Sequence, residues 1–162
     1  MKQIISRIDR CSEWLGYLAA WMYFLVGMMI AYEVLARYLF NAPTIWAQEL
    51  SQLLFLWATF LGVSRALKRD QHIRINALES IMSDSTTYWL RLVTLVFISL
   101  LCILVVSYGI LIFWDSFVRG RSTGTMLNIP NWWSEAVIPT GFGILFLQSL
   151  VEIARQIRKK LR

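Results

Sequence analysis

The sequence predicts an all-α membrane protein with four transmembrane helices. Its 162 residues are 57% hydrophobic and only 16% charged, whereas soluble domains carry about 25% charged residues. Four apolar runs are long enough to cross a bilayer, which takes a helix of about 20 residues. Lys and Arg residues gather beside these runs on one predicted side of the membrane. Together these observations favour a polytopic membrane protein over a soluble one.

The predicted spans form a single membrane domain over residues 1–162. They cover about residues 14–36, 45–66, 88–114 and 132–152. In hydrocarbon each unpaired backbone N–H or C=O group costs several kcal/mol, so a span must satisfy these groups internally. Each of the four runs is therefore predicted to be an α-helix.

The basic residues predict the orientation. Thirteen of the sixteen Lys and Arg residues fall in or beside the two terminal segments and the connection between the second and third spans. By the positive-inside rule, both termini and that connection are expected to be cytoplasmic. The same placement accounts for the net charge of +6 without nucleic acid, because the basic residues form no stripe with exposed aromatic residues.

Two segments outside the spans have the pattern of short amphipathic helices that lie in the membrane interface. Before the first span, Ile4, Ile5 and Ile8 recur at helical spacing among charged residues; a mobile tail is the alternative. In the cytoplasmic connection, Asn76 and Glu79 have the spacing of a capping box at the start of a second such helix.

Charged residues also gather at the predicted outward ends of the spans. The group comprises Glu33, Arg37, Glu49, Asp115, Arg119 and Glu135. Two acid–arginine pairs in it stand four residues apart with the acid first, the favourable order for an ion pair on a helix. Glu49 lies inside the second run and is expected to need a partner such as Arg37. Two interpretations remain open, a docking surface or charge network for a partner, and ordinary anchoring and capping.

Proline and glycine mark irregular or closely packed positions. Pro43 suits the turn before the second span, which Asn41 or Thr44 is expected to cap. Pro139 is expected to kink the last span, because it has no N–H group to donate to the carbonyl four residues earlier. Small surfaces near Gly62, Gly109 and Gly141 are expected to receive partner helices. The connection before the last span is expected to be ordered only by what it packs on.

Several segments together resemble the small membrane subunit (Q-type, DctQ-like) of tripartite ATP-independent periplasmic (TRAP) transporters. The first is RYLFNAPTIWAQEL, with Arg37, Pro43, Trp46 and Glu49. It is followed by FLWATFLG, with Trp57, Phe60 and Gly62, then by His72 and Ile73, and finally by Ile129, Pro130 and Pro139. The order and spacing of these segments within four spans carry the resemblance.

The resemblance implies a non-catalytic subunit of a secondary, ion-gradient-driven transporter for organic acids in the bacterial inner membrane. A large multi-span subunit would carry the substrate and sodium sites, and a periplasmic substrate-binding protein would deliver the solute. This chain would scaffold the large subunit, help to dock the binding protein and hold no cofactor of its own. The transported solute would be set by the other subunits.

Residue chemistry agrees with a scaffold. No series of acids or histidines crosses the predicted spans, as a proton or ion path would require. Because His72 is the only histidine, the chain alone cannot supply two-histidine haem ligation or a Cys/His zinc cluster. Two other classes remain open, a haem-free membrane anchor of an enzyme complex and a self-assembling small channel. Tryptophans such as Trp14 and Trp21 are expected to face membrane lipids.

Overall fold

The computed structural model describes residues 2–79 and 84–160. Its helices are α1 (Lys2–Leu39), α2 (Ile45–Glu79), α3 (Asp84–Arg119), α4 (Asn131–Glu135) and α5 (Val137–Lys160). Four helical stretches, with α4 and α5 forming one of them, are long and apolar enough to cross a membrane. The predicted all-α fold with four such helices is therefore confirmed.

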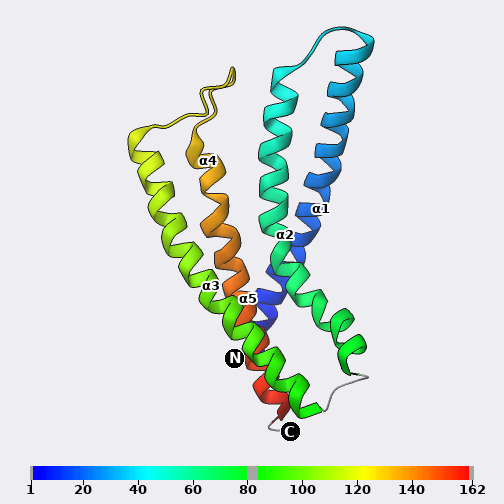
Figure 1. Ribbon diagram of the computed structural model, residues 1–162, viewed down its shortest axis with the longest axis vertical. Helices are drawn as coiled ribbons and strands as arrows, with labels where there is room; N and C mark the ends of the chain where they lie inside the picture. The colour runs from blue at the N-terminus through cyan, green and yellow to red at the C-terminus, as the bar shows by residue number, and fades with distance from the viewer. Residues whose placement is uncertain (1, 80–83, 161–162) are drawn as a thin grey trace.

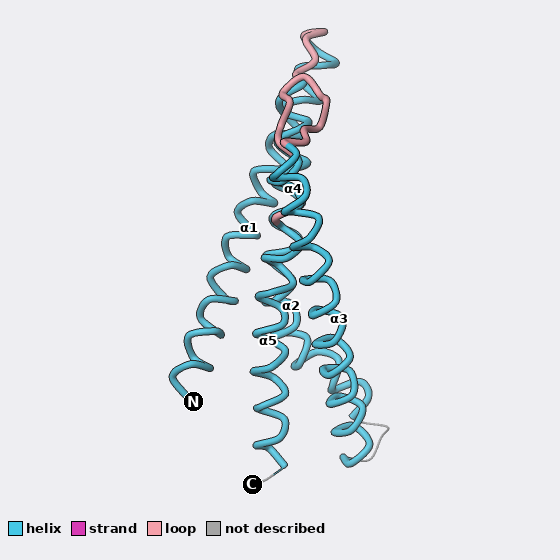
Figure 2. Tube along the Cα trace, turned by 90° about the vertical axis from the view of Figure 1, so that its left-hand side faces the viewer, coloured by secondary structure: helices cyan, strands magenta, loops and turns pink. Residues whose placement is uncertain are grey.

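The helices form two pairs. α1 packs along α2, α3 packs along α5, and α2 and α5 make the main contact between the pairs (Figure 1). Residues 40–44 and 120–130 connect helices at one end of the molecule, here called the loop end. Both termini lie toward the opposite end, here called the terminal end. The two pairs diverge toward the loop end in Figure 1, whereas the view in Figure 2 shows α1 and α5 separating toward the terminal end.

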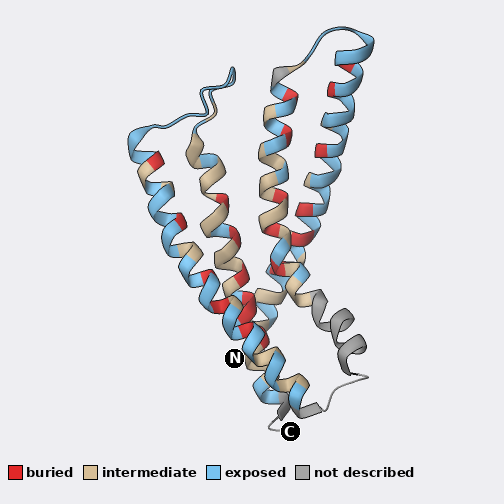
Figure 3. Ribbon diagram, viewed as in Figure 1, coloured by how far each residue is buried: buried red, intermediate tan, exposed pale blue. Residues whose placement is uncertain are grey.

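Most of the helix surface is exposed within the single chain (Figure 3). In the most apolar 18-residue segments of α1, α2 and α3, only 17% to 22% of the segment is buried. In the corresponding segment of the stretch formed by α4 and α5, 39% is buried. The central place of α5, which contacts both α3 and α2, explains its greater burial. Exposed apolar faces suit lipid tails or further membrane helices, since neither offers water to the side chains.

The helices are longer than the predicted spans, because the segments that flank the spans are helical too. α1 begins at Lys2, so the amphipathic lead-in is helical and continuous with the first span. α2 runs to Glu79 and includes the position of His72. Residues 80–82, part of the second predicted amphipathic helix, lie outside the described residues. The interfacial location of both segments and the orientation of the chain stay predictions.

Glycines bring neighbouring helices of this chain close together. A Cβ atom added at Gly141 would lie 2.7 Å from the Cβ of Phe60, and one at Gly109 would lie 3.2 Å from the Cγ2 of Ile138. A Cβ atom at Gly62 would be in ordinary contact with α1, at 3.5 Å. The expectation that these glycines receive partner helices is wrong, because helices of the same chain already occupy the positions.

Pro139 coincides with a break in the last membrane-crossing stretch. The helix is interrupted at Ala136, between α4 and α5. Pro139 has no N–H group to donate to the carbonyl of Glu135, so the ladder of hydrogen bonds cannot be continuous there. The interruption lies where the sequence predicts a kink, and the kink itself stays a prediction.

The loop between α3 and α4 is held by its own backbone. The N–H group of Thr123 donates to the carbonyl of Ile129, and that of Asn131 donates to the carbonyl of Arg121, both at 3.0 Å. Gly124 turns the chain with a φ of +64°, a conformation that costs glycine little. The expectation that this loop is ordered only by what it packs on is therefore wrong.

Candidate functional site

The charged residues predicted as a group from the sequence lie at the loop end, but they form separate contacts. Glu33 is buried, with 8% of its surface exposed. Nη2 and Nε of Arg37 donate to its Oε1 atom at 2.7 and 3.2 Å. The predicted ion pair between these residues, four positions apart on α1, is confirmed.

The second carboxylate oxygen of Glu33 holds the start of α2. The backbone N–H group of Thr44 donates to Oε2 at 2.9 Å, and the Thr44 hydroxyl donates to the same oxygen. The hydroxyl of Thr44 therefore gives its proton to α1, and the capping of α2 by Asn41 or Thr44 stays a prediction. Glu33 thus fixes the turn between α1 and α2 from the α1 side.

Asp115 at the end of α3 has two arginine partners. Nε of Arg119 lies 2.6 Å from Oδ1, and Nη2 of Arg121 lies 2.7 Å from Oδ2. The pair with Arg119 has the predicted spacing of four residues and is confirmed. The side chain of Arg119 is 65% exposed, so water competes for these contacts and their contribution to stability is small.

Glu49 is linked to the other helix pair through a threonine. The hydroxyl of Thr125, in the loop between α3 and α4, donates to Oε2 of Glu49 at 2.8 Å. Thr125 gives its single hydroxyl proton to Glu49, so it accepts the hydrogen bond from Thr123, whose Oγ1 lies 2.6 Å away. The expectation that Arg37 partners Glu49 is wrong in this structure, because Arg37 binds Glu33.

The remaining predicted residues lie on α2, on α4 and in the two loops of the loop end. The Oε2 atom of Glu135 is buried and has no hydrogen-bond partner among the described residues. The ring of Trp46 lies 5.9 Å from that of Tyr32, between α2 and α1, and Trp57 is partly buried on α2. Pro43 is exposed in the loop before α2. Pro130 forms an isolated antiparallel β-bridge with Ser122 of the same loop. Their structural roles stay predictions.

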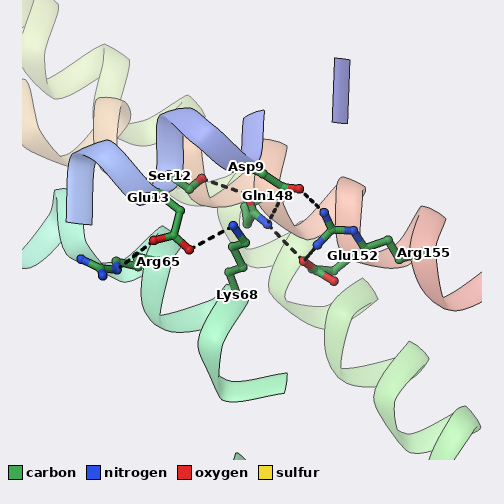
Figure 4. A network of polar contacts seen from close by, with 8 residues as sticks. All are labelled: Asp9, Ser12, Glu13, Arg65, Lys68, Gln148, Glu152 and Arg155. Atoms are coloured by element: carbon green, nitrogen blue, oxygen red, sulfur yellow. Dashed lines mark hydrogen bonds and ion pairs between the residues drawn. The ribbon is translucent and has the colours of Figure 1, made fainter. Parts of the chain in front are cut away.

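A second polar cluster lies at the terminal end, and the sequence analysis did not single it out. This terminal-end network joins α1, α2 and α5 (Figure 4). It comprises Asp9, Ser12, Glu13, Arg65, Lys68, Gln148, Glu152 and Arg155.

Gln148 is the centre of the terminal-end network. It is 0% exposed, and its neighbour Glu152 is 1% exposed. The Gln148 carbonyl accepts a hydrogen bond from Ser12 at 2.9 Å, and its amide nitrogen donates to Asp9 at 3.3 Å and to Glu152 at 3.1 Å. Both ends of the amide are thus hydrogen-bonded, which a buried amide requires.

Arg155 neutralises the acids around Gln148. Its Nη1 atom donates to Glu152 at 2.7 Å, and its Nη2 atom forms an ion pair with Asp9. A buried carboxylate such as Glu152 is strongly disfavoured without a partner. The arginine therefore allows α5 to carry an acid against α1.

Arg65 and Lys68 extend the network to α2. Nζ of Lys68 lies 3.0 Å and Nε of Arg65 lies 3.4 Å from the carboxylate of Glu13. The guanidinium of Arg65 also lies 4.1 Å above the ring of Tyr17, a cation–π contact. A Cβ atom at Gly16 would lie 1.9 Å from Cδ of Arg65, so the arginine fits only against glycine.

The sequence contains one signal for this network. Gln148, Glu152 and Arg155 recur at spacings of four and three, which places them on one face of a helix. The helix that this face contacts is set by packing.

Among residues 2–79 and 84–160, no group of three or more His, Cys, Asp and Glu side chains is arranged to hold a metal ion.

Comparison with known proteins gives a consistent set of relatives. Residues 26–159 match the family described as tripartite ATP-independent periplasmic transporters, DctQ component. The sialic acid TRAP transporter permease protein SiaT of Haemophilus influenzae is 34% identical over 136 residues, which are 82% of this chain and 20% of that protein. The isethionate TRAP transporter permease protein DctMQ of Oleidesulfovibrio alaskensis is 23% identical over 143 residues, 83% of this chain and 21% of that protein.

A shorter match joins the chain to the sialic acid TRAP transporter small permease protein SiaQ of Vibrio cholerae. It is 34% identical over 47 residues, which are 29% of this chain and 27% of that protein. This chain thus spans about one fifth of the length of the two longer relatives.

Proposed function

Because this chain belongs to the DctQ component family of TRAP transporters and is a multi-pass protein of the bacterial inner membrane, we propose that it scaffolds a large transport subunit. The large subunit carries the solute and sodium sites and moves the solute by using an ion gradient. A periplasmic substrate-binding protein delivers the solute to the pair of membrane subunits. This chain performs no chemistry and helps to dock the binding protein.

The distribution of charge is the observation that supports a scaffold most directly. Residues 14–32, 50–64, 92–114 and 136–151 contain no Asp, Glu, Lys, Arg or His. An ion or proton path normally uses such groups in the middle of the membrane. The described ion pairs lie instead at the loop end and the terminal end, and those at the terminal end join different helices.

The terminal-end network supports the same role. It joins α5 to α1 through the buried side chain of Gln148 and joins α1 to α2 through the ion pairs of Glu13. Buried, fully bonded polar groups hold helices in one arrangement. The outer helix faces stay exposed and apolar, so helices of a larger subunit can pack against a fixed surface.

The solute is proposed to be an organic acid. Two relatives are named for sialic acid and for isethionate, so related chains are named for different acids. We therefore assign the choice of solute to the large subunit and to the binding protein.

Vesicle reconstitution tests the proposal. Labelled sialic acid and isethionate serve as probes, in vesicles with an inward sodium gradient. The chain alone is expected to give no uptake above empty vesicles. Uptake is expected only when the large subunit from the same genome and its substrate-binding protein are added, and the chain is expected to co-purify with that large subunit. Uptake by the chain alone, or full uptake by the partners without it, would contradict the proposal.

A further inference from the structure

A cavity of about 370 Å³ opens beside Glu49 at the loop end, between α2 and the loop that joins α3 to α4. Its lining includes Gln52 and Ser134 as well as the apolar side chains of Leu53, Phe55 and Leu56. We propose that this cavity, the Glu49 pocket, binds a phospholipid whose headgroup carries a primary ammonium, as phosphatidylethanolamine does. The inference concerns the chain by itself and does not depend on the proposed transport role.

The carboxylate of Glu49 supplies the site for the ammonium group. Within the described part of the chain, its hydrogen bond comes from the neutral hydroxyl of Thr125, and no Lys or Arg forms an ion pair with it. Glu33 and Asp115 at the same end each have arginine partners. An acid inside a membrane-crossing stretch is costly without a partner of opposite charge. The pocket thus offers one negative charge to a cationic ligand.

Two further side chains supply donors for the phosphate group. The amide of Gln52 and the hydroxyl of Ser134 line the same pocket, and neither makes a side-chain hydrogen bond to another described residue. Both can donate to phosphate oxygens. The hydroxyl protons of Thr123 and Thr125 are already used in the chain of hydrogen bonds that ends at Glu49.

The apolar wall fits the acyl chains. Leu53, Phe55 and Leu56 follow Glu49 along α2 by four to seven residues, which is a displacement of about 6–10 Å along a helix. Phe55 is 52% exposed. The polar groups thus lie near the start of the α2 stretch, and the apolar groups lie deeper, in the order that a phospholipid presents from headgroup to tail.

The chemistry of the pocket separates this ligand from two others. An anionic lipid is disfavoured, because Glu49 repels it and no basic residue is among those that line the pocket. A Lys or Arg side chain of a partner protein would bind Glu49 but would not use the donors of Gln52 and Ser134. A zwitterionic lipid with an ammonium and a phosphate group satisfies all three side chains.

Native mass spectrometry of the full chain released from phosphatidylcholine nanodiscs tests the inference. The nanodiscs contain equal small amounts of phosphatidylethanolamine and phosphatidylglycerol as the two probes. The unmodified chain is expected to retain phosphatidylethanolamine about tenfold more than phosphatidylglycerol, as one charge-assisted hydrogen bond predicts. Glu49→Gln is expected to remove this preference. Asp115→Asn, which neutralises another acid at the same end, is expected to leave it unchanged.

A second variant guards against a folding defect in Glu49→Gln. Gln52→Leu changes an exposed side chain and is expected to weaken phosphatidylethanolamine retention several-fold, with an unchanged melting temperature. Equal retention of both lipids by the unmodified chain would overturn the inference. So would unchanged retention in both variants. If the unmodified chain shows no lipid preference and Glu49→Gln instead abolishes co-purification with the large subunit, a basic side chain of that subunit occupies the pocket and the lipid assignment is wrong.

Discussion

The terminal end and the loop end both bring charged side chains together, but the described hydrogen bonds between the two helix pairs differ in burial: that of Ser12 with Gln148 is buried, and that of Thr125 with Glu49 is exposed. At the terminal end, Gln148 and Glu152 are almost completely buried, and Gln148 bonds Ser12 and Asp9 on another helix. At the loop end, the arginine partners of Glu33 and Asp115 come from the same helix or from the loop that follows it. Among the described residues of the loop end, the hydrogen bond from Thr125 to Glu49 joins one helix pair to the other.

The difference shows how burial changes the role of a polar group. A buried group that loses its partner cannot turn to water, so the terminal-end network specifies one arrangement of α1 and α5. An exposed pair at the loop end exchanges its partner for water at little cost. We therefore interpret the terminal end as the fixed joint of the molecule and the loop end as the adaptable part.

The largest expected effect on stability comes from a substitution in the terminal-end network. Glu152→Ala removes one of the two acceptors of Gln148 and of Arg155. It should lower the free energy of unfolding by about 3 kcal/mol, the cost typical of breaking a buried charged pair. Chemical unfolding in detergent, followed by circular dichroism, measures the change. The control is Asp115→Asn, which alters an exposed pair and should have little effect. Equal losses in the two variants would show that the terminal end is no more fixed than the loop end.

An intermediate effect is expected from Glu33. Glu33→Ala removes the acceptor of the Thr44 backbone N–H group, so the turn between α1 and α2 should open locally. The free energy of unfolding should fall by roughly half as much as in Glu152→Ala, because Arg37 is half exposed and can bind water. Hydrogen exchange measures the local effect as faster exchange of the Thr44 amide. Unchanged exchange at Thr44 would refute the assigned role of Glu33.

The smallest expected effect on stability comes from the contact that joins the pairs at the loop end. Thr125→Val removes one exposed hydrogen bond and should cost about 0.5 kcal/mol. It should nevertheless broaden the distance distribution between spin labels placed at the exposed positions Phe40 and Met126, as pulsed electron paramagnetic resonance can measure.

Thr140→Val is the matched control for this measurement. The Thr140 hydroxyl bonds carbonyls of its own helical segment, so its removal should leave the distances unchanged. A distribution that stays narrow in Thr125→Val would show that the loop end is as fixed as the terminal end.

The sequence predicts those contacts of the candidate site that join two residues of the same helix. The pairs of Glu33 with Arg37 and of Asp115 with Arg119 follow from a spacing of four residues. The partner of Glu49 could not be predicted, because Thr125 lies 76 positions away. The terminal-end network was missed for the same reason, since it joins residues as far apart as Asp9 and Arg155, 146 positions.

The sequence by itself determined that the chain is helical and has four stretches able to cross a membrane, because hydrocarbon forces each apolar run to satisfy its own backbone. It also determined the ion pairs within single helices, because 3.6 residues per turn fix which side chains are neighbours. Only the tertiary structure decided that Gly16 admits Arg65 and that Gln148 reaches Ser12. These contacts depend on how whole helices pack, and no spacing along the chain encodes the distance between two helices.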